Sequence, residues 1–440
     1  MIDTIRECFR KRFQKDDFCA FVKVFGCQQN EADAEKIKGF LKSIGFSFVN
    51  DPIVADLVLF ETCAVRHTAE NRVFGQIGSL KNIKKMNPNA FISVCGCMVE
   101  RDEVNTKLKK MFPYVDLICG AKSLDHFPNM LYEKLTSKKI DSFCEMPVLR
   151  ESKFHAWVPI ISGCNNFCSY CIVPFVRGSE KSIDHNIIIN DCIKNINSGA
   201  KILTLLGQNV NSYDFNGVKF TDLIKMIDKL DGNFIFRFMT SHPKDFNKEL
   251  VDVLSQCKHF SGNIHLPVQS GNNRILKLMN RKYKVEDYIE KINYARSKIN
   301  NLVLTSDIIV GFPGETDSEF NDTLDLVKNI KFNSIFTFIY SPRKGTAAYS
   351  MVDDIPYDVK SARISNLIKS QEKISEDLLS DLVGKNFHVI IESISDNYSL
   401  ARTKSNLLVK LENLILPTGK IFEVKITSSN RNCLIAEILR

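Results

Sequence analysis

The chain has 440 residues, more than one hydrophobic core normally serves, so two or three domains are expected. Hydrophobic residues make up 44% and charged residues 25% of it, as in folded soluble proteins, and no apolar run approaches the ~20 residues that cross a bilayer. These values exclude a fibrous, a disordered and a membrane-spanning protein, and the cytoplasm is the expected location. The formal net charge of +8 permits a polyanionic partner such as nucleic acid without requiring one.

The first region, from about Phe18 to Leu135, alternates short apolar runs with amphipathic stretches. Strands are predicted at 18–25, 56–60 and 90–94, and the segments between them carry apolar residues at the offsets of one helical face. Strands that alternate with helices predict a parallel sheet covered on both faces. We therefore expect an N-terminal parallel α/β domain over residues 18–135.

A second region with the same alternation runs from about Trp157 to Met351, with strands predicted at 202–206, 234–239, 263–267, 302–310 and 334–339. This pattern predicts a full or partial β/α barrel within residues 150–380, whose functional groups would follow the C-terminal ends of the strands. Those ends carry polar, glycine-containing segments: Gly207-Gln208-Asn209, Ser241-His242-Pro243, Gln269-Ser270-Gly271 and Gly311-Phe312-Pro313-Gly314. After a helix predicted at about 358–382, residues 382–440 carry short β-like runs typical of a small β-barrel.

The strongest signal in the chain is the segment Cys164-Asn165-Asn166-Phe167-Cys168-Ser169-Tyr170-Cys171. A ferredoxin-type site saturates a [4Fe-4S] cluster with four cysteines, whereas this segment offers three and would leave one iron open. S-adenosylmethionine chelates such an iron, and a reduced cluster can pass an electron into its sulfonium to release a 5′-deoxyadenosyl radical. The segment therefore indicates a radical S-adenosylmethionine enzyme in preference to a zinc site, which would need a fourth Cys or His.

A second set of cysteines is spread along the first region. Cys27, Cys63 and Cys97 each follow one of its predicted strands, and loops at one edge of a parallel sheet converge in space. They would form another three-cysteine site with an open iron. The alternative is that they are small apolar residues of the core, and strand alternation does not decide between Cys95 and Cys97 for the third place. Core packing is expected for the remaining cysteines: Cys8, Cys19, Cys119, Cys144, Cys192, Cys257 and Cys433.

From about Phe18 to the C-terminus the chain resembles the methylthiotransferases, a family of radical S-adenosylmethionine enzymes, and most closely their MiaB branch. That branch comprises the tRNA-2-methylthio-N6-dimethylallyladenosine synthases. The resemblance lies in an ordered set of motifs: Gly26-Cys27-Gln28, Thr62-Cys63-Ala64-Val65-Arg66, Cys95-Gly96-Cys97-Met98, Cys164 to Cys171 followed by Ile172-Val173-Pro174, Leu206-Gly207-Gln208-Asn209-Val210, and His265-Leu266-Pro267-Val268-Gln269-Ser270-Gly271. The branch assignment rests mainly on the loop from Ala64 to Phe74.

The resemblance implies that Cys27, Cys63 and Cys97 hold an auxiliary [4Fe-4S] cluster, and that Cys164, Cys168 and Cys171 hold the radical-generating one. It implies that S-adenosylmethionine is both methyl donor and radical source. The expected reaction is methylthiolation at C2 of N6-isopentenyladenosine at position 37 of tRNA. The expected partners are this tRNA, an electron donor such as flavodoxin and a sulfur source, without a membrane. The domain of residues 382–440 would be a TRAM domain, a small RNA-binding barrel.

The cofactor contacts are less firmly marked than the cysteines. Gln208 and Asn209 occupy the strand-end position that contacts the methionine part of S-adenosylmethionine in radical enzymes, and Ile309 with Gly311 resembles the turn that packs near its adenine. The alternative is that all four belong to ordinary barrel turns. The chain departs from the family pattern at Glu61, Ile183 and Lys344, where Asn, Arg and Pro are common.

Two other functions are consistent with parts of this pattern. A sibling methylthiotransferase would act on threonylcarbamoyl-adenosine in tRNA or on an aspartate of a ribosomal protein. A non-catalytic iron-sulfur electron carrier or RNA-binding module belongs to a different class. An electron carrier is expected to shield its cluster with four protein ligands, so the two sets of three cysteines argue against it.

Overall fold

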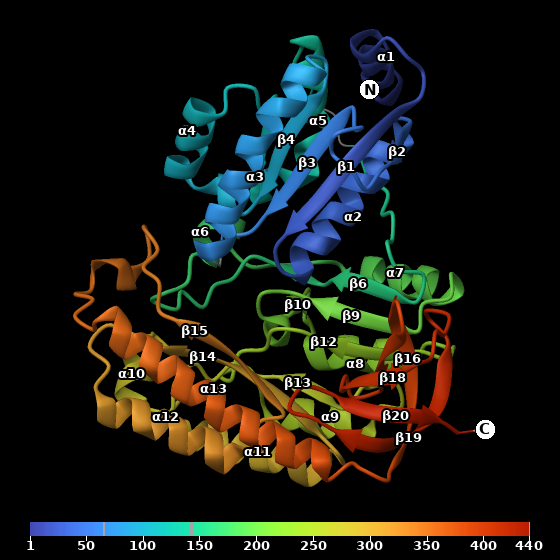
Figure 1. Cartoon of the computed structure of the whole chain (residues 1–440). Coiled ribbons are helices and arrows are strands. Elements are labelled where there is room, and N and C mark those ends of the chain that lie inside the picture. The colour runs from blue at the N-terminus through green and yellow to red at the C-terminus, as the bar shows by residue number, and fades with distance from the viewer. Residues whose placement is uncertain (65–66, 141–143, 440) are drawn as a thin grey trace. The chain divides into compact units, whose positions relative to one another are not determined.

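The structure is a computed structural model that describes residues 1–64, 67–140 and 144–439 (Figure 1). The chain forms two compact units, and it passes between them more than once. The first unit contains residues 1–152, 162–165 and 172–180, and the second contains residues 153–161, 166–171 and 181–440. The domain boundaries expected from the sequence, 18–135, 150–380 and 382–440, stay predictions.

The first unit is built on a parallel five-stranded sheet with the strand order β2-β1-β3-β4-β5. Its strands are β1 (Phe18–Phe25), β2 (Phe46–Phe48), β3 (Leu57–Thr62), β4 (Phe91–Gly96) and β5 (Leu117–Gly120). Its longer helices are α1 (Ile2–Phe13), α2 (Gln28–Ser43), α3 (His67–Met86), α4 (Asp102–Met111) and α5 (Phe127–Thr136), followed by the short α6 (Val173–Arg177). All three strands predicted in this region are present.

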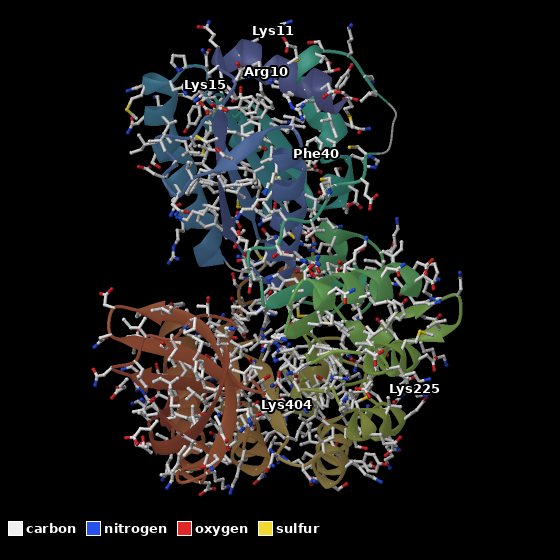
Figure 2. All side chains as sticks on the ribbon, turned by 90° about the vertical axis from the view of Figure 1, so that its right-hand side faces the viewer. Arg10, Lys11, Lys15, Phe40, Lys225 and Lys404 are labelled. Carbon is white, nitrogen blue, oxygen red and sulfur yellow. The ribbon has the colours of Figure 1, made fainter. Side chains whose placement is uncertain are left out.

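Alternation along the buried strands places apolar side chains on both faces of this sheet. On one face, Leu57, Leu59 and Phe91 pack against α1, α2 and α5. On the other face, Val58, Phe60 and Ile92 pack against α3 and α4. Figure 1 shows α3 and α4 on one side of the sheet and α1 and α2 on the other. Figure 2 places Phe40 of α2 inside this unit, with Arg10, Lys11 and Lys15 together at the end that carries α1.

The second unit contains two parallel three-stranded sheets, β12-β9-β6 and β13-β14-β15. Their strands are β6 (His155–Pro159), β9 (Ile202–Leu206), β12 (Ile235–Phe238), β13 (Asn263–His265), β14 (Val303–Val310) and β15 (Ser334–Ile339). Phe236 of β12 exchanges backbone hydrogen bonds with residues 259 and 261, just before β13, which brings the two sheets together as a partial barrel. Four two-residue strands form two further pairs before the C-terminal part: β7 (Ile161–Ser162) with β8 (Lys181–Ser182), and β10 (Asp214–Phe215) with β11 (Val218–Lys219).

Helices cover the outward-facing side chains of these strands in one large apolar core. They are α7 (His185–Asn197), α8 (Phe220–Asp228), α9 (Lys248–Gln256), α10 (Asn273–Leu278), α11 (Val285–Lys298), α12 (Asp317–Ile330) and α13 (Tyr357–Ser380). The five predicted strands of this region match β9, β12, β13, β14 and β15, and α13 matches the predicted helix. The first strand, β6, lies in the region assigned to the barrel but was not singled out by the sequence pattern.

The C-terminal part is a closed barrel with the order β16-β17-β18-β20-β19. Its strands are β16 (Asn386–Ser395), β17 (Tyr398–Thr403), β18 (Leu408–Glu412), β19 (Ile421–Ser429) and β20 (Leu434–Ile438), and alternate residues fill its interior. Arg237 of β12 donates to Asn406, in the turn between β17 and β18, which joins this barrel to the partial barrel. The predicted α/β class with a small C-terminal β-barrel is confirmed. In the part of the chain that the structure describes, no helix is long and apolar enough to span a membrane.

Candidate functional site

The three cysteines that follow β1, β3 and β4 lie at the same edge of the parallel sheet. Cys27 is the residue before α2, Cys63 comes directly after β3, and Cys97 directly after β4. A side-chain hydrogen bond from Cys63 lowers the pKa of the Cys27 thiol to about 6, and the positive charge of Arg177 acts in the same direction. The topology therefore brings Cys27 and Cys63 into contact although 36 residues separate them in sequence.

Arg177, at the end of α6, contacts the third cysteine of this set. Its Nε donates to Cys97 Sγ at 3.1 Å, and its Nη2 donates to Asp33 Oδ2 at 2.8 Å. Burial raises the pKa of Cys97 to about 12, and the charge of Arg177 opposes that rise. One guanidinium thus acts on both Cys27 and Cys97, and Cys63 interacts with Cys27.

A buried framework of hydrogen bonds fixes the loops that carry these cysteines. Asn30 Oδ1 accepts from the Cys27 backbone N–H at 3.2 Å, and Asn30 Nδ2 donates to Glu61 Oε1 at 2.9 Å. The Thr62 carbonyl in turn accepts the backbone N–H of Cys97 at 2.9 Å. Burial raises the pKa of Glu61, at the position where the family commonly has Asn, well above its usual range.

Cys95 is separated from Cys97 by its packing. It lies in the apolar core on the α1, α2 and α5 face of the sheet, beside Cys119 of β5. Burial raises the pKa of the Cys95 thiol well above its usual range, and its nearest hydroxyl is Ser93 Oγ at 3.5 Å. Cys97 instead packs with Ala64, Ile172 and Val176. This geometry favours Cys97 as the third member of the set.

Gly96 allows the close approach between β3 and the loop that carries Cys97. Its φ is +102°, and a Cβ added there would lie 2.3 Å from the Thr62 carbonyl oxygen. The Gly96→Ala change is therefore expected to cost ~1–3 kcal/mol in backbone strain and a further ~1–3 kcal/mol in overpacking. Gly199 is the matched control, since its φ is +99° but nothing lies within 4 Å of an added Cβ. Thermal unfolding of both variants measures the difference, and equal losses would contradict the close-contact explanation.

The segment from Cys164 to Cys171 is held by contacts within each unit. In the first unit, the Cys164 backbone N–H donates to the Gly178 carbonyl at 3.2 Å. In the second unit, Ser169 donates to carbonyls at the end of α10, with its Oγ 2.8 Å from the Leu278 oxygen. The Ser169 carbonyl accepts the Ala348 N–H at 2.7 Å, and the Cys171 N–H donates to the Cys168 carbonyl at 2.9 Å. The backbone around Cys168 and Cys171 is thus fixed from two sides.

Arg281 follows α10 and is a buried cation next to this segment. Its Nη1 donates to Cys168 Sγ at 3.3 Å, and its Nη2 donates to the Pro267 carbonyl at 2.8 Å. Its Nε donates to Tyr283 Oη at 2.9 Å. Among the described residues, no carboxylate lies within ion-pair distance of Arg281. A buried cation is costly without an anionic partner.

Two family descriptions match the chain. Residues 19–120 match the uncharacterized protein family UPF0004, and residues 158–327 match the radical SAM superfamily. A tRNA-2-methylthio-N(6)-dimethylallyladenosine synthase of Acetivibrio thermocellus is 40% identical over 100% of this chain and 95% of the relative. Another, from Clostridium botulinum (strain Loch Maree / Type A3), is 43% identical over 95% of this chain and 96% of the relative. The chain belongs to this synthase family.

Solved structures of other proteins share the fold of this chain, although their sequence identity to it is much lower than that of the synthases. The radical S-adenosylmethionine methyltransferase TsrM of Kitasatospora setae, with cobalamin and a [4Fe-4S] cluster bound, is 11% identical with a TM-score of 0.58, covering 76% of this chain and 77% of that one. The cobalamin-dependent radical enzyme OxsB with S-adenosylmethionine bound is 12% identical with a TM-score of 0.52, covering 81% of this chain and 56% of that one. These likenesses bear on the fold alone.

The residues expected to contact the cofactor lie where the barrel strands end. Asn209 is 1% exposed and both ends of its amide are used within the protein: Nδ2 donates to Asp245 Oδ2 at 2.6 Å, and Oδ1 accepts from the His242 N–H at 3.0 Å. Gln208 is half-buried beside it. Asn209 thus ties the loop after β9 to the loop after β12, which is a positioning contact.

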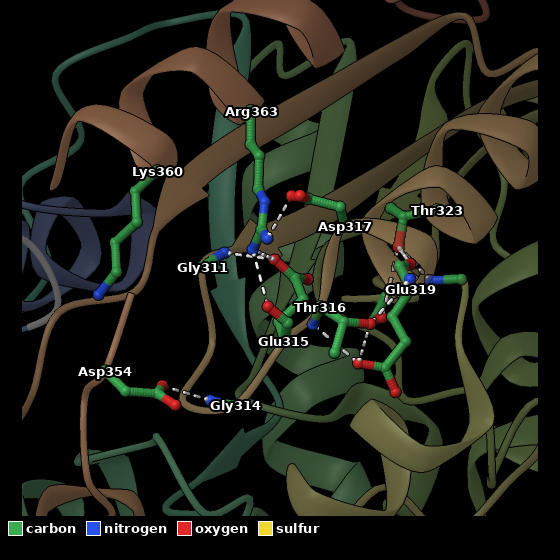
Figure 3. A network of polar contacts seen from close by, with 12 residues as sticks. Gly311, Gly314, Glu315, Thr316, Asp317, Glu319, Thr323, Asp354, Lys360 and Arg363 are labelled. Atoms are coloured by element: carbon green, nitrogen blue, oxygen red, sulfur yellow. Dashed lines mark hydrogen bonds and ion pairs between the residues drawn. The ribbon is translucent and has the colours of Figure 1, made fainter. Parts of the chain in front are cut away.

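Ile309 lies near the end of β14, and Gly311 is the first residue of the turn that follows it. Ile309 is buried and packs with Phe312 and Tyr340. Gly311 has a φ of +67°, and a Cβ there would lie 2.5 Å from the Lys360 side chain. Figure 3 shows how this turn is held: the Glu315 carboxylate accepts from the Gly311 N–H at 2.7 Å and from Arg363 Nη1 at 2.9 Å.

The same network continues to α12 and to the segment before α13. Arg363 Nη2 donates to Asp317 Oδ1 at 2.7 Å, and the Gly314 N–H donates to Asp354 Oδ1 at 3.2 Å (Figure 3). Burial raises the pKa of Glu315, while Arg363 and the Gly311 N–H oppose that shift. The turn is therefore rigidly presented by residues of α13, which the sequence did not associate with it.

Buried polar atoms without a hydrogen-bond partner lie in the loops that follow the partial-barrel strands. Among the described residues, the buried side-chain atoms without a hydrogen-bond partner include both amide atoms of Asn211, Ser241 Oγ and Gln269 Oε1. They follow β9, β12 and β13 respectively. Buried polar atoms are costly when unsatisfied, so their surroundings fit a polar ligand. The sequence located the three loops and included Ser241 and Gln269 in them, but it did not single out Asn211.

The departures from the family pattern have local explanations at two positions. Ile183 packs against the core of the partial barrel, and its carbonyl accepts the Tyr213 hydroxyl at 2.7 Å. Glu61 is satisfied on one oxygen by Asn30, as described above. Lys344 is exposed, and nothing in the structure explains the change there. In the loop from Ala64 to Phe74, Val65 and Arg66 lie outside the described residues.

Proposed function

We propose that the protein is a tRNA methylthiotransferase, which inserts a methylthio group at C2 of N6-isopentenyladenosine at position 37 of tRNA. The observation that carries the proposal is the near-full-length identity of about 40% to synthases named for this product, combined with two separate three-cysteine sets at the ends of parallel strands. S-Adenosylmethionine and two [4Fe-4S] clusters are the cofactors of this reaction.

We infer that Cys27, Cys63 and Cys97 hold the auxiliary cluster. Among the described residues, no group of three or more His, Cys, Asp or Glu side chains is arranged to hold a single metal ion. A four-iron cluster does not need such convergence, because each cysteine binds a different iron. Arg177 acts on Cys27 and Cys97, and Cys63 hydrogen-bonds Cys27, which fits that donor set better than a single-ion site.

The radical-generating cluster is assigned to Cys164, Cys168 and Cys171. Arg281 supports this assignment, since an anionic cluster beside Cys168 would supply the negative charge that its buried guanidinium lacks. When bound, this cluster supplies the electron that cleaves S-adenosylmethionine reductively. The orphaned atoms of Asn211, Ser241 and Gln269 would then hydrogen-bond the polar groups of that cofactor. The roles expected for Gln208, Asn209, Ile309 and Gly311 are those of residues that shape the loops around it.

The partners follow from the substrate. A tRNA with isopentenylated adenosine 37 is the substrate, and the closed C-terminal barrel would contribute accessory RNA contacts as a TRAM domain. The reaction requires an electron donor, for which flavodoxin is the expected type, and a source of sulfur. The cytoplasmic location expected from the sequence stays a prediction.

Nucleoside analysis of cellular tRNA tests this function. Deleting the gene is expected to remove 2-methylthio-N6-isopentenyladenosine completely and to accumulate N6-isopentenyladenosine, because the precursor is formed before the sulfur is inserted. Mass spectrometry of digested tRNA from deleted and complemented cells measures both nucleosides. Loss of a methylthiolated threonylcarbamoyl-adenosine instead would assign the protein to the sibling activity.

A further inference from the structure

Arg177 is a buried charge in an unusual sequence position. It ends α6, whose first residue, Val173, comes two residues after Cys171, yet its side chain contacts Cys97 and Asp33, which lie 80 and 144 residues away along the chain. The side chains of Arg177 and Asp33 are only 8% and 6% exposed. Neither residue was expected from the sequence to belong to a site.

The local structure fixes the Arg177 side chain against the loops that carry Cys63 and Cys97. Ile172 and Val176 pack with Ala64 and Cys97 in a small apolar cluster, which seats α6 on the loops after β3 and β4. Gly178, with a φ of +79°, ends the helix directly after Arg177, and its carbonyl accepts the Cys164 N–H. The guanidinium is therefore fixed from both sides of its own backbone.

The contacts of Arg177 are those of a group that stabilises a charged sulfur centre. Its Nε donates to Cys97 Sγ at 3.1 Å, while its Nη2 donates to Asp33 Oδ2 at 2.8 Å. Hydrogen bonds to ligand sulfurs and the local net charge are the main protein influences on the reduction potential of an iron-sulfur cluster. A cationic N–H donor stabilises the reduced cluster, which carries one more negative charge, and so raises its potential.

We propose that Arg177 is a positioning residue of the auxiliary cluster, holding the Cys97 ligand by an N–H···S hydrogen bond and setting the cluster's reduction potential against the opposing charge of Asp33. The inference rests on the proposed function, since it requires a cluster at Cys27, Cys63 and Cys97. In this proposal the negative charge of Asp33 lowers the reduction potential of the cluster, whereas Arg177 raises it. The helix that follows the radical-cluster cysteines in sequence thereby serves the other cysteine set.

The test uses the full chain with Cys164, Cys168 and Cys171 replaced by Ala, so that only the auxiliary cluster remains. Iron content and a redox titration followed by electron paramagnetic resonance are then measured on this parent and on its variants. Arg177→Gln is expected to shift the midpoint potential to a more negative value, and Arg177→Lys by a smaller amount because the charge is kept. Asp33→Asn is expected to shift it to a less negative value, since the opposing charge is removed.

Arg150→Gln is the matched control. Arg150 is half-buried and forms an ion pair with the buried Glu35 at 2.8 Å in the same unit. It is expected to reduce stability without moving the potential. If Arg177→Gln loses the cluster, Asp33→Asn decides: a shift to a less negative value supports the proposal, and an unchanged value overturns it. An unchanged potential in Arg177→Gln with full iron also overturns it. A parent without a cluster would instead contradict the proposed auxiliary site.

Discussion

Replacing Cys27, Cys63 and Cys97 together with Ala is expected to abolish the methylthio product while leaving reductive cleavage of S-adenosylmethionine to 5′-deoxyadenosine in place. The three residues come from loops after β1, β3 and β4 in the first unit, whereas Cys168 and Cys171 are held by contacts with α10 and the segment near Ala348 in the second. Product analysis with isopentenylated tRNA and measurement of 5′-deoxyadenosine in the same reaction separate the two steps.

Folding has to be checked first in this variant, because a metal site that ties three loops together contributes to stability as well as to chemistry. Circular dichroism and retained iron at the other cysteine set provide that check. Cys95→Ala is the matched control, since Cys95 lies two residues from Cys97 but packs in the core beside Cys119. It is expected to keep both activities. Methylthiolation by a folded triple variant would show that these cysteines do not take part in sulfur transfer.

The strands that position the site could be predicted where a short hydrophobic run was bounded on both sides by polar or glycine residues. The predicted strands at 18–25, 202–206 and 334–339 have the same limits as β1, β9 and β15. Once β1, β3 and β4 were placed, parallel pairing alone brought their C-terminal loops to one edge. The helix α1 was not predicted, since charged residues lie between its apolar residues Ile5 and Phe9. Their role is visible only in the folded protein, where both pack with Phe91 in one core.

The charges around the two cysteine sets could not be predicted in the same way. Arg177 and Arg281 reach their cysteines over 80 and 113 residues of sequence, and no periodic pattern records such a contact. The choice between Cys95 and Cys97 depended likewise on which side of β4 meets α6, and alternation along the strand does not contain that information.

Replacing Cys164, Cys168 and Cys171 together with Ala is expected to abolish 5′-deoxyadenosine formation completely and to halve the iron content. The anaerobically reconstituted protein should hold about eight irons in two four-iron clusters, and the variant about four. Cys192→Ala is the control, because Cys192 of α7 is buried in the core of the second unit and is expected to bind no iron.

The iron measurement also tests the two-cluster assignment independently of activity. Arg281 loses the Cys168 sulfur that accepts from its Nη1 in this variant, and a buried guanidinium that loses a hydrogen-bond partner destabilises its surroundings. The variant should therefore unfold at a lower temperature than Cys192→Ala, and adding Arg281→Met to it should recover part of that loss. Iron near four in the unmodified protein after full reconstitution would mean that only one of the two cysteine sets holds a cluster.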